Sequence, residues 1–231
     1  MNYLAHFVFN HDVCGLPPEP YFAIGVALPD LWPRFSRRRR IRWQIVRDAR
    51  PADEHAEQLR AGLLNHVAVD RRFHALSCFL QWQRQLKAGT ATGGTCAAIW
   101  DLASHVALEF ALDRHLVCRD ADLAERFYTQ LAACDLGVVE QQVGTLAGVD
   151  ARGLRRTIGG LLARRYLHRF RSISAVRQAL QLVLELGSVR PLPAKGALNE
   201  LVSAAALLVD PHCVWAGLLD ASAANAQVPE A

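Results

Sequence analysis

Residues 62–74 read GLLNHVAVDRRFH, and this stretch indicates both the fold and the chemistry of the chain. His66, Asp70 and His74 recur in it every four residues, among apolar side chains. Because residues four apart lie on one face of an α-helix, the stretch predicts a helix with three metal-binding side chains in a single row.

A second stretch repeats this spacing, since residues 104–113 read SHVALEFALD and carry His105, Glu109 and Asp113. Eight residues of helix rise about 12 Å, so three side chains of one row cannot share one ion, whereas a pair one turn apart can. We therefore expect two facing helices, each supplying such a pair to one or two divalent ions about 3.5–4 Å apart. The third residue of each row would bind a second ion, orient a ligand or transfer a proton.

The rest of the sequence favours helices. Of its 231 residues 52% are hydrophobic, and Ala, Leu, Val and Arg dominate. No sustained alternation with a period of two indicates strands. We predict an all-α fold of eight or nine helices, as a single compact domain over residues 1–231 with a disordered tail at about 222–231. The expected helices cover about 3–9, 21–28, 54–87, 96–118, 120–133, 136–146, 151–168, 173–187 and 195–208, with a loop at 10–20.

Charge, cysteines and hydropathy argue against several function classes. The net charge of +4 permits a phosphate-bearing substrate but does not require nucleic acid, and we expect no stable nucleic-acid complex. Six scattered cysteines without a CxxC pair argue against a zinc ribbon and predict free, buried thiols. The start of the chain lacks a signal-peptide pattern, and no run of about 20 apolar residues occurs. We therefore expect a cytoplasmic protein without membrane insertion.

Further candidate residues lie outside the two rows. His6 lies in an apolar stretch and Asp30 in a turn-like setting, where a core histidine and a helix cap are the more usual roles. Both remain candidates to complete a metal site. Arg34, Arg38 and Arg42 belong to the densest positive patch of the chain. Such a run is usually a solvated charged face, and the alternative is a clamp for a phosphate or an acidic partner protein.

The chain resembles the bacterial acyl-carrier-protein phosphodiesterase family, which looks like a divergent helical relative of the HD-type metal-dependent phosphohydrolases. The resemblance covers roughly the first half of the chain and lies in four segments: MNYLAH at 1–6, Ile24-Gly25 through Pro29-Asp30-Leu31, Gly62-x3-His66-x3-Asp70, and Asp101-x3-His105. It implies an HD-like helical bundle, a metal-site scaffold and, as substrate, a phosphopantetheine-type linkage on an acyl carrier protein.

This chain departs from the family pattern at two positions. The family has an Asp directly before the central histidine, where this chain has Ser104, so that the His-Asp doublet is broken. The family also has an Asp four residues after Asp70, where this chain has His74. Glu109 and Asp113 would have to supply the missing carboxylates, as in a distinct branch of the family.

The preferred prediction is a metal-dependent hydrolase of phosphodiesters or phosphomonoesters, acting on a phosphorylated small molecule or an acyl carrier protein. Carboxylates favour Mn²⁺ or Mg²⁺, and imidazoles also admit Fe or Zn²⁺. The predicted roles fall into three sets: metal ligands (His6, Asp30, His66, Asp70, His105 and Glu109), proton relays (His74 and Asp113) and phosphate-binding arginines (Arg34, Arg38 and Arg42).

Two alternatives stay open. The first is a non-catalytic helical protein that binds a partner through its basic face, and the broken doublet at Ser104 favours it. The second is a hydrolase like the helical zinc phospholipases and nucleases, which also place His and Asp on facing helices. The sequence does not indicate the oligomeric state.

Overall fold

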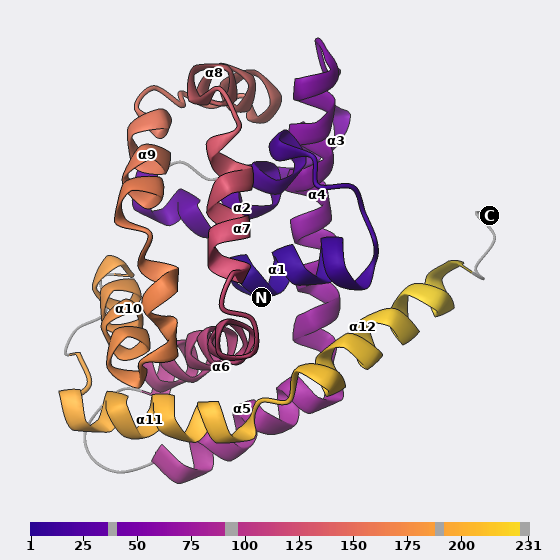
Figure 1. The fold of residues 1–231 in the computed structure, drawn as a ribbon. Coiled ribbons are helices and arrows are strands. Elements are labelled where there is room, and N and C mark those ends of the chain that lie inside the picture. Colours follow the sequence, from indigo (N-terminus) through magenta and orange to yellow (C-terminus); the bar gives the residue numbers. More distant parts are fainter. Residues whose placement is uncertain (37–40, 91–96, 188–191, 227–231) are drawn as a thin grey trace. The chain divides into compact units, whose positions relative to one another are not determined.

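The computed structural model describes residues 1–36, 41–90, 97–187 and 192–226, and all secondary structure in these ranges is helical (Figure 1). The predicted all-α fold is thereby confirmed. The helices are α1 (Tyr3–Val8), the π-helix η1 (Phe9–Val13), α2 (Pro20–Phe35), α3 (Trp43–Asp48), α4 (Glu54–Ala75), α5 (Ser77–Thr90), α6 (Ala97–Arg119), α7 (Leu123–Ala132), α8 (Leu136–Ala147), α9 (Leu154–Arg164), the 3₁₀-helix η2 (Tyr166–Arg171), α10 (Ile173–Leu186), α11 (Lys195–Leu208) and α12 (Pro211–Ala226).

Several helix ends differ from the prediction. The helix expected to stop at Pro29 continues as α2 to Phe35, although Pro29 and Pro33 lack the N–H that an interior helical residue donates. Burial of side chains along α2, from Tyr21 to Trp32, keeps the segment helical. The helix expected over 54–87 is divided at Leu76 into α4 and α5, and the loop expected at 10–20 begins with η1. Such ends depend on tertiary packing, which local sequence patterns do not report.

A positive backbone angle ends α9 earlier than expected. The predicted helix over 151–168 stops at Arg164, because Arg165 has φ of 45°, in the left-handed region. The chain then continues as the short helix η2. Two helices, α3 and α12, were not predicted at all.

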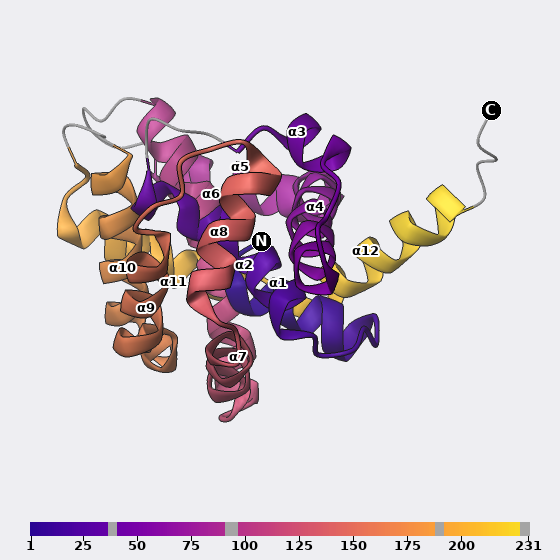
Figure 2. The ribbon, with the colours of Figure 1, turned by 90° about the horizontal axis from the view of Figure 1, so that it is seen from above.

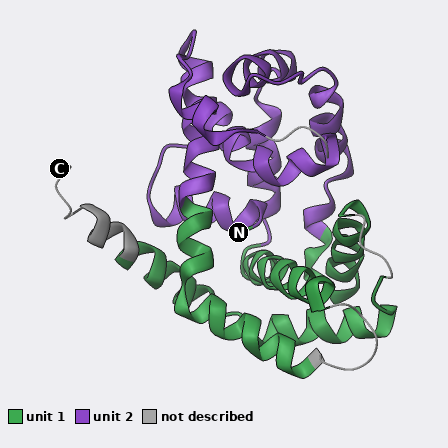
Figure 3. Ribbon diagram, turned by 180° about the vertical axis from the view of Figure 1, so that it is seen from behind, with its two compact units in different colours: residues 1, 69–120, 169–231 green, residues 2–68, 121–168 purple. Residues whose placement is uncertain are grey.

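Two compact units divide the chain (Figure 3). Unit 1 contains Met1, Val69–Asp120 and Arg169–Ala231, and unit 2 contains Asn2–Ala68 and Ala121–His168. Helix α4 contributes residues to both units. The single domain expected over 1–231 stays a prediction. Of the expected tail, residues 227–231 lie outside the described residues, and α12 reaches Ala226.

The core of unit 1 is built around α6, which packs against α5, α10 and α11 (Figure 2). Buried residues occur along α6 from Ile99 to Val117 and on all its sides. A helix that is apolar all round is stable only when other elements surround it. The apolar character of residues 104–113 therefore explains why the second row lies on a largely buried helix.

In unit 2, α2 packs against α1, α7 and α9, and its backbone also touches that of α4. A Cβ atom on Gly62 of α4 would lie 2.2 Å from the carbonyl oxygen of Phe22 in α2. A Cβ atom on Gly25 would likewise lie 2.5 Å from the carbonyl oxygen of Leu59. Only glycine fits at these positions, so the two helices cross in direct backbone contact.

The last two helices of unit 1 follow one another at an angle. No single helix of the described residues is long and apolar enough to cross a membrane. Helix α11 and residues Pro211–Asp220 pass that test together, as a pair bent by 61°. His115 of α6 holds α11, because its Nε2 atom lies 2.8 Å from the carbonyl oxygen of Ala206.

Candidate metal centre

Three ligand-type side chains of unit 1 meet at one point. The Nε2 atoms of His74 and His105 lie 3.0 Å and 3.1 Å from the same atom, Oε1 of Glu109. One ligand atom of each residue lies within 4.8 Å of those of the other two. His74 comes from the last turn of α4, whereas His105 and Glu109 are one turn apart on α6. The tertiary structure thus joins one residue of the first row to two of the second.

An aromatic side chain holds the two imidazoles in place. Phe79 of α5 lies with its ring centroid 5.3 Å from that of His74 and 5.2 Å from that of His105. Its own ring packs on Phe73 at 4.6 Å, and only 1% of Phe79 is exposed. Because a fully buried ring cannot easily turn, Phe79 limits the rotation of both histidines. Sequence reasoning missed this residue, since its spacing from His74 carries no chemical signal.

The carboxylate at the centre of this cluster is ionised at neutral pH. Burial alone raises the pKa of Glu109, whose side chain is only 14% exposed. The positive charge of the Met1 amino group and hydrogen bonds from His105 and His74 outweigh burial and hold the pKa well below its usual range. Glu109 therefore offers a negative charge next to two imidazole nitrogens.

A second carboxylate lies in the same cluster. The Met1 amino group forms ion pairs with Asp70 and with Glu109, the latter at 3.4 Å. One positively charged group is thus shared by the two carboxylates of this cluster. Two carboxylates that share one ammonium group form a place where positive charge is favoured.

The donor set fits a divalent transition metal. Two imidazoles and one carboxylate are the protein ligands of many catalytic zinc sites and of non-haem iron sites. Ligand atoms about 2.0–2.1 Å from a tetrahedral ion are separated from one another by about 3.3 Å. The distances of 3.0 Å and 3.1 Å from His74 and His105 to Glu109 are close to that value. His74, His105 and Glu109 could therefore bind one ion after a small adjustment, once the Nε2 protons donated to Glu109 have moved to Nδ1.

A second histidine cluster lies in unit 2. Nδ1 of His66 lies 2.9 Å from the carbonyl oxygen of Val26, which can only accept, so Nδ1–H is the donor. The ring's other nitrogen, Nε2, lies 3.9 Å from Oδ1 of Asp30. The His6 ring stacks on the His66 ring with 4.3 Å between centroids. Both histidines are buried, with 0% and 4% exposed.

This hydrogen bond determines which ring nitrogen of His66 can bind a metal ion. With the proton held on Nδ1 by Val26, the lone pair of the neutral ring is on Nε2, as in histidines that ligate metals. Gly62 precedes His66 by one helical turn, and its contact with α2 brings the imidazole within reach of that carbonyl group. The Gly-x3-His spacing noted in the sequence therefore has a direct structural reason.

The other predicted residues lie as follows. Asp113 is completely buried on α6, one turn beyond Glu109. Arg34 donates a hydrogen bond to the Tyr166 hydroxyl at 3.4 Å, and its guanidinium lies 5.1 Å from the centre of that ring. Arg42 is exposed at the start of α3. Arg38 lies outside the described residues.

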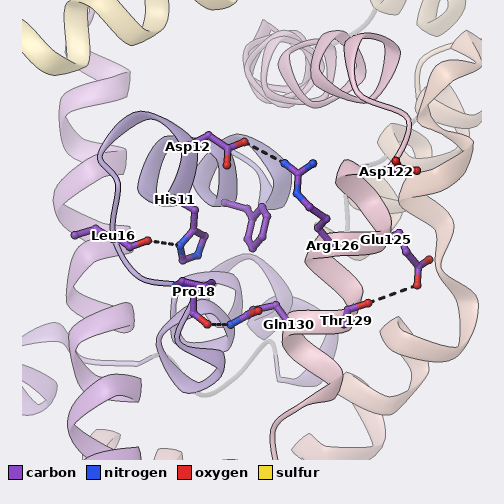
Figure 4. A pocket seen from close by; sticks show the side chains of 10 residues that line it. His11, Asp12, Leu16, Pro18, Asp122, Glu125, Arg126, Thr129 and Gln130 are labelled. Carbon is purple, nitrogen blue, oxygen red and sulfur yellow. Dashed lines mark hydrogen bonds and ion pairs between the residues drawn. The ribbon is translucent and has the colours of Figure 1, made fainter.

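Unit 2 also has a surface pocket, between the segment 7–18 and α7 (Figure 4). Its volume is ≈ 560 Å³. Polar pairs cross it: Arg126 to Asp12 at 3.1 Å, and Gln130 to the carbonyl oxygen of Pro18. The Nδ1 atom of His11 lies 3.0 Å from the carbonyl oxygen of Leu16. These pairs attach the segment to α7, and we assign the pocket no chemistry.

Comparison with models of protein families, with curated proteins and with solved structures found no match for this chain. The family resemblance described above therefore stays a prediction.

Proposed function

We propose that this protein is a metal-dependent hydrolase of phosphoric esters, with His74, His105 and Glu109 as metal ligands in unit 1. One observation carries the proposal, namely the approach of two imidazole nitrogens to a single carboxylate oxygen at 3.0 Å and 3.1 Å. Two helix faces that were fully solvated would leave both histidines exposed. Here each histidine is only about a third exposed, at 32% and 31%.

The side chains around this point have distinct roles. Glu109, kept ionised by its neighbours, provides the charge that balances a cation. Asp70 provides a second carboxylate in the same unit. Phe79 orients both imidazoles and forms an apolar wall, which strengthens electrostatic interactions beside it. A divalent ion such as Mn²⁺, Mg²⁺, Fe²⁺ or Zn²⁺, when bound, supplies Lewis acidity that activates water and polarises a phosphoryl group.

We also assign a ligand role to His6, His66 and Asp30 within unit 2. The support is the hydrogen bond from Nδ1 of His66 to Val26, which leaves Nε2 with a lone pair and with Asp30 nearby. Asp113 is proposed as a proton relay, because it is a buried carboxyl one turn from Glu109. The HD-like description of the helical bundle belongs to this proposal as well.

The proposed substrate is a phosphorylated small molecule or the phosphopantetheine-type linkage of an acyl carrier protein. The family resemblance suggests the second of these. The net charge of +4 and the exposed Arg42 support an anionic substrate. Arg34, held by Tyr166, presents a guanidinium in a fixed orientation, as binding of a phosphate by two hydrogen bonds requires.

A non-catalytic helical binding protein is the second candidate. It is favoured by the hydrogen bonds that His74 and His105 already make to Glu109, because a polar cluster satisfied in this way is stable without an ion. The zinc phospholipase-like or nuclease-like hydrolase remains a variant of the first proposal, and it requires a preference for Zn²⁺.

Elemental analysis of the freshly purified chain, combined with a screen of phosphoester substrates, tests the proposal. We expect near-stoichiometric metal and hydrolysis in the native protein, and the loss of both in a His74→Ala/His105→Ala double variant. No bound metal after incubation with Mn²⁺, Fe²⁺ or Zn²⁺ would make the cluster structural and would support the binding protein instead.

A further inference from the structure

Two cysteines of unit 1 lie against one another. Cys78, in the first turn of α5, lies close enough to Cys213, in the first turn of α12, for that thiol to raise its pKa, and the two helices pack against each other. Cys78 is half-buried and Cys213 is exposed. Of the five described cysteines only Cys134 is buried, so the expectation of buried thiols was wrong for the others. Exposure leaves the Cys213 sulfur open to a reagent from solution.

The contact between these helices does not depend on the thiols alone. One turn after Cys213, a Cβ atom on Gly217 would lie 2.8 Å from the Cδ2 atom of Leu76, so the backbone of α12 rests on that leucine. On the other side of Cys213, Arg119 of α6 lies with Nη1 3.2 Å from Nε2 of His212. Contacts before and after Cys213 therefore hold it beside Cys78.

We propose that Cys78 and Cys213 form a dithiol site, which a small disulfide such as oxidised glutathione converts into an intramolecular disulfide. The thiolate of Cys213 attacks one sulfur of the reagent, forms a mixed disulfide and releases one glutathione thiolate. Cys78 then loses its proton and attacks the Sγ atom of Cys213, which releases the second glutathione thiolate. Two protons from the cysteines convert the released thiolates into two glutathione thiols, so that atoms and electrons balance.

The environments of the two sulfurs decide the order of these steps. Burial and the neighbouring Cys213 thiol raise the pKa of Cys78 to about 12, which makes it a poor first nucleophile. Cys213 is the exposed partner and so meets the reagent first. Once the mixed disulfide has formed, Cys78 is the neighbouring thiol that attacks it.

The dithiol site lies next to a residue that packs on the proposed metal ligands. Cys78 precedes Phe79, whose ring packs on His74 and His105. A disulfide would tie α12 to the segment that carries this ring. The dithiol proposal does not depend on the hydrolase proposal, because its test detects a covalent bond and requires neither metal nor activity.

Peptide mapping of the full chain tests the site directly. The protein is incubated with oxidised glutathione, alkylated and digested with trypsin without reduction. Trypsin places Cys78 in the peptide 73–84 and Cys213 in the peptide 196–231, each without another cysteine. We expect these two peptides to be linked in oxidised protein and to separate after reduction.

Serine variants separate the two steps. Cys78→Ser should stop at the mixed disulfide, with one glutathione on Cys213, and Cys213→Ser should lose the linked peptide altogether. The exposed Cys118 provides the control, and Cys118→Ser should form the link as the native chain does. The proposal is overturned if Cys118 becomes glutathionylated while peptides 73–84 and 196–231 stay unlinked, or if Cys213 forms only links between chains.

Discussion

The Nε2 atom of His74 lies 3.0 Å from Oε1 of Glu109, although 35 residues separate the two in the chain. His74 is the last ligand-type residue of the row on α4, and Glu109 is the middle residue of the row on α6. Their meeting, together with His105, turns two separate helical patterns into one cluster of donors.

Replacing Glu109 with Gln should remove metal from the protein. The substitution keeps the shape of the side chain but loses the negative charge, and amides are poor ligands for transition metals. We expect the bound metal to fall at least tenfold in elemental analysis and by titration with Zn²⁺ or Mn²⁺.

Asp101→Asn is the matched control for this change. Asp101 lies on the same helix, two turns before Glu109, and is 53% exposed in an ion pair with Lys87 at 2.7 Å. Its variant should retain metal as the native chain does. If Glu109→Gln retained full metal, the assignment of Glu109 as a ligand would be wrong.

Asp70→Asn should abolish both metal retention and turnover. Asp70 and Glu109 share one positive group in unit 1, and removing one carboxylate weakens the attraction for any cation there. Metal content and hydrolysis of a phosphodiester should therefore fall together in this variant. Normal turnover in Asp70→Asn would show that Asp70 does not belong to the site.

Glu109 should make the metal-free protein sensitive to acid. Its pKa is lowered in the folded state from the ordinary value of 4.5, so its contribution to stability is present above that pH. The contribution is lost as the pH falls through the folded pKa. In buffer with a chelator, the free energy of unfolding of the native chain should exceed that of Glu109→Gln near neutral pH.

Urea denaturation at several pH values between about 6 and 3 measures this difference. We expect it to shrink steadily below about pH 4.5. A difference that stayed constant over the whole range would show that the Glu109 pKa is not lowered by folding.

Gly62→Ala should destabilise the protein by about 1–3 kcal/mol or more, because the new methyl group would meet the carbonyl oxygen of Phe22 at 2.2 Å. Gly159→Ala is the matched control in the same unit. Gly159 lies inside α9 and has nothing within 4 Å of the added Cβ, so its variant should gain about 0.5–1 kcal/mol. Urea denaturation measures both, and equal effects of the two changes would contradict the close contact of α2 with α4.

The sequence by itself allowed the all-α fold and the two rows of ligand-type residues to be predicted. Helical spacing is a local property, since the pitch of one helix places residues four apart on one face. This is why His105 and Glu109 were expected to act together and do lie in contact, at 3.1 Å. The apolar residues between them likewise indicated that α6 is buried.

Helix ends were predicted less well, because they depend on what each segment packs against. Pro29 was expected to end a helix that in fact continues to Phe35, and Leu76 interrupts one that was expected to continue. At Pro29 local propensity favoured one outcome, and burial of neighbouring side chains favoured the other.

Only the tertiary structure decided which residues of the two rows become partners. His66 and His74 lie on one helix and belong to the same row, yet His66 lies beside Val26 and Asp30 in unit 2, whereas His74 joins Glu109 in unit 1. The spacing within a helix determines which side chains share a face. The element that this face meets depends on contacts between segments far apart in the chain, such as the backbone contact at Gly62, and no local pattern encodes them.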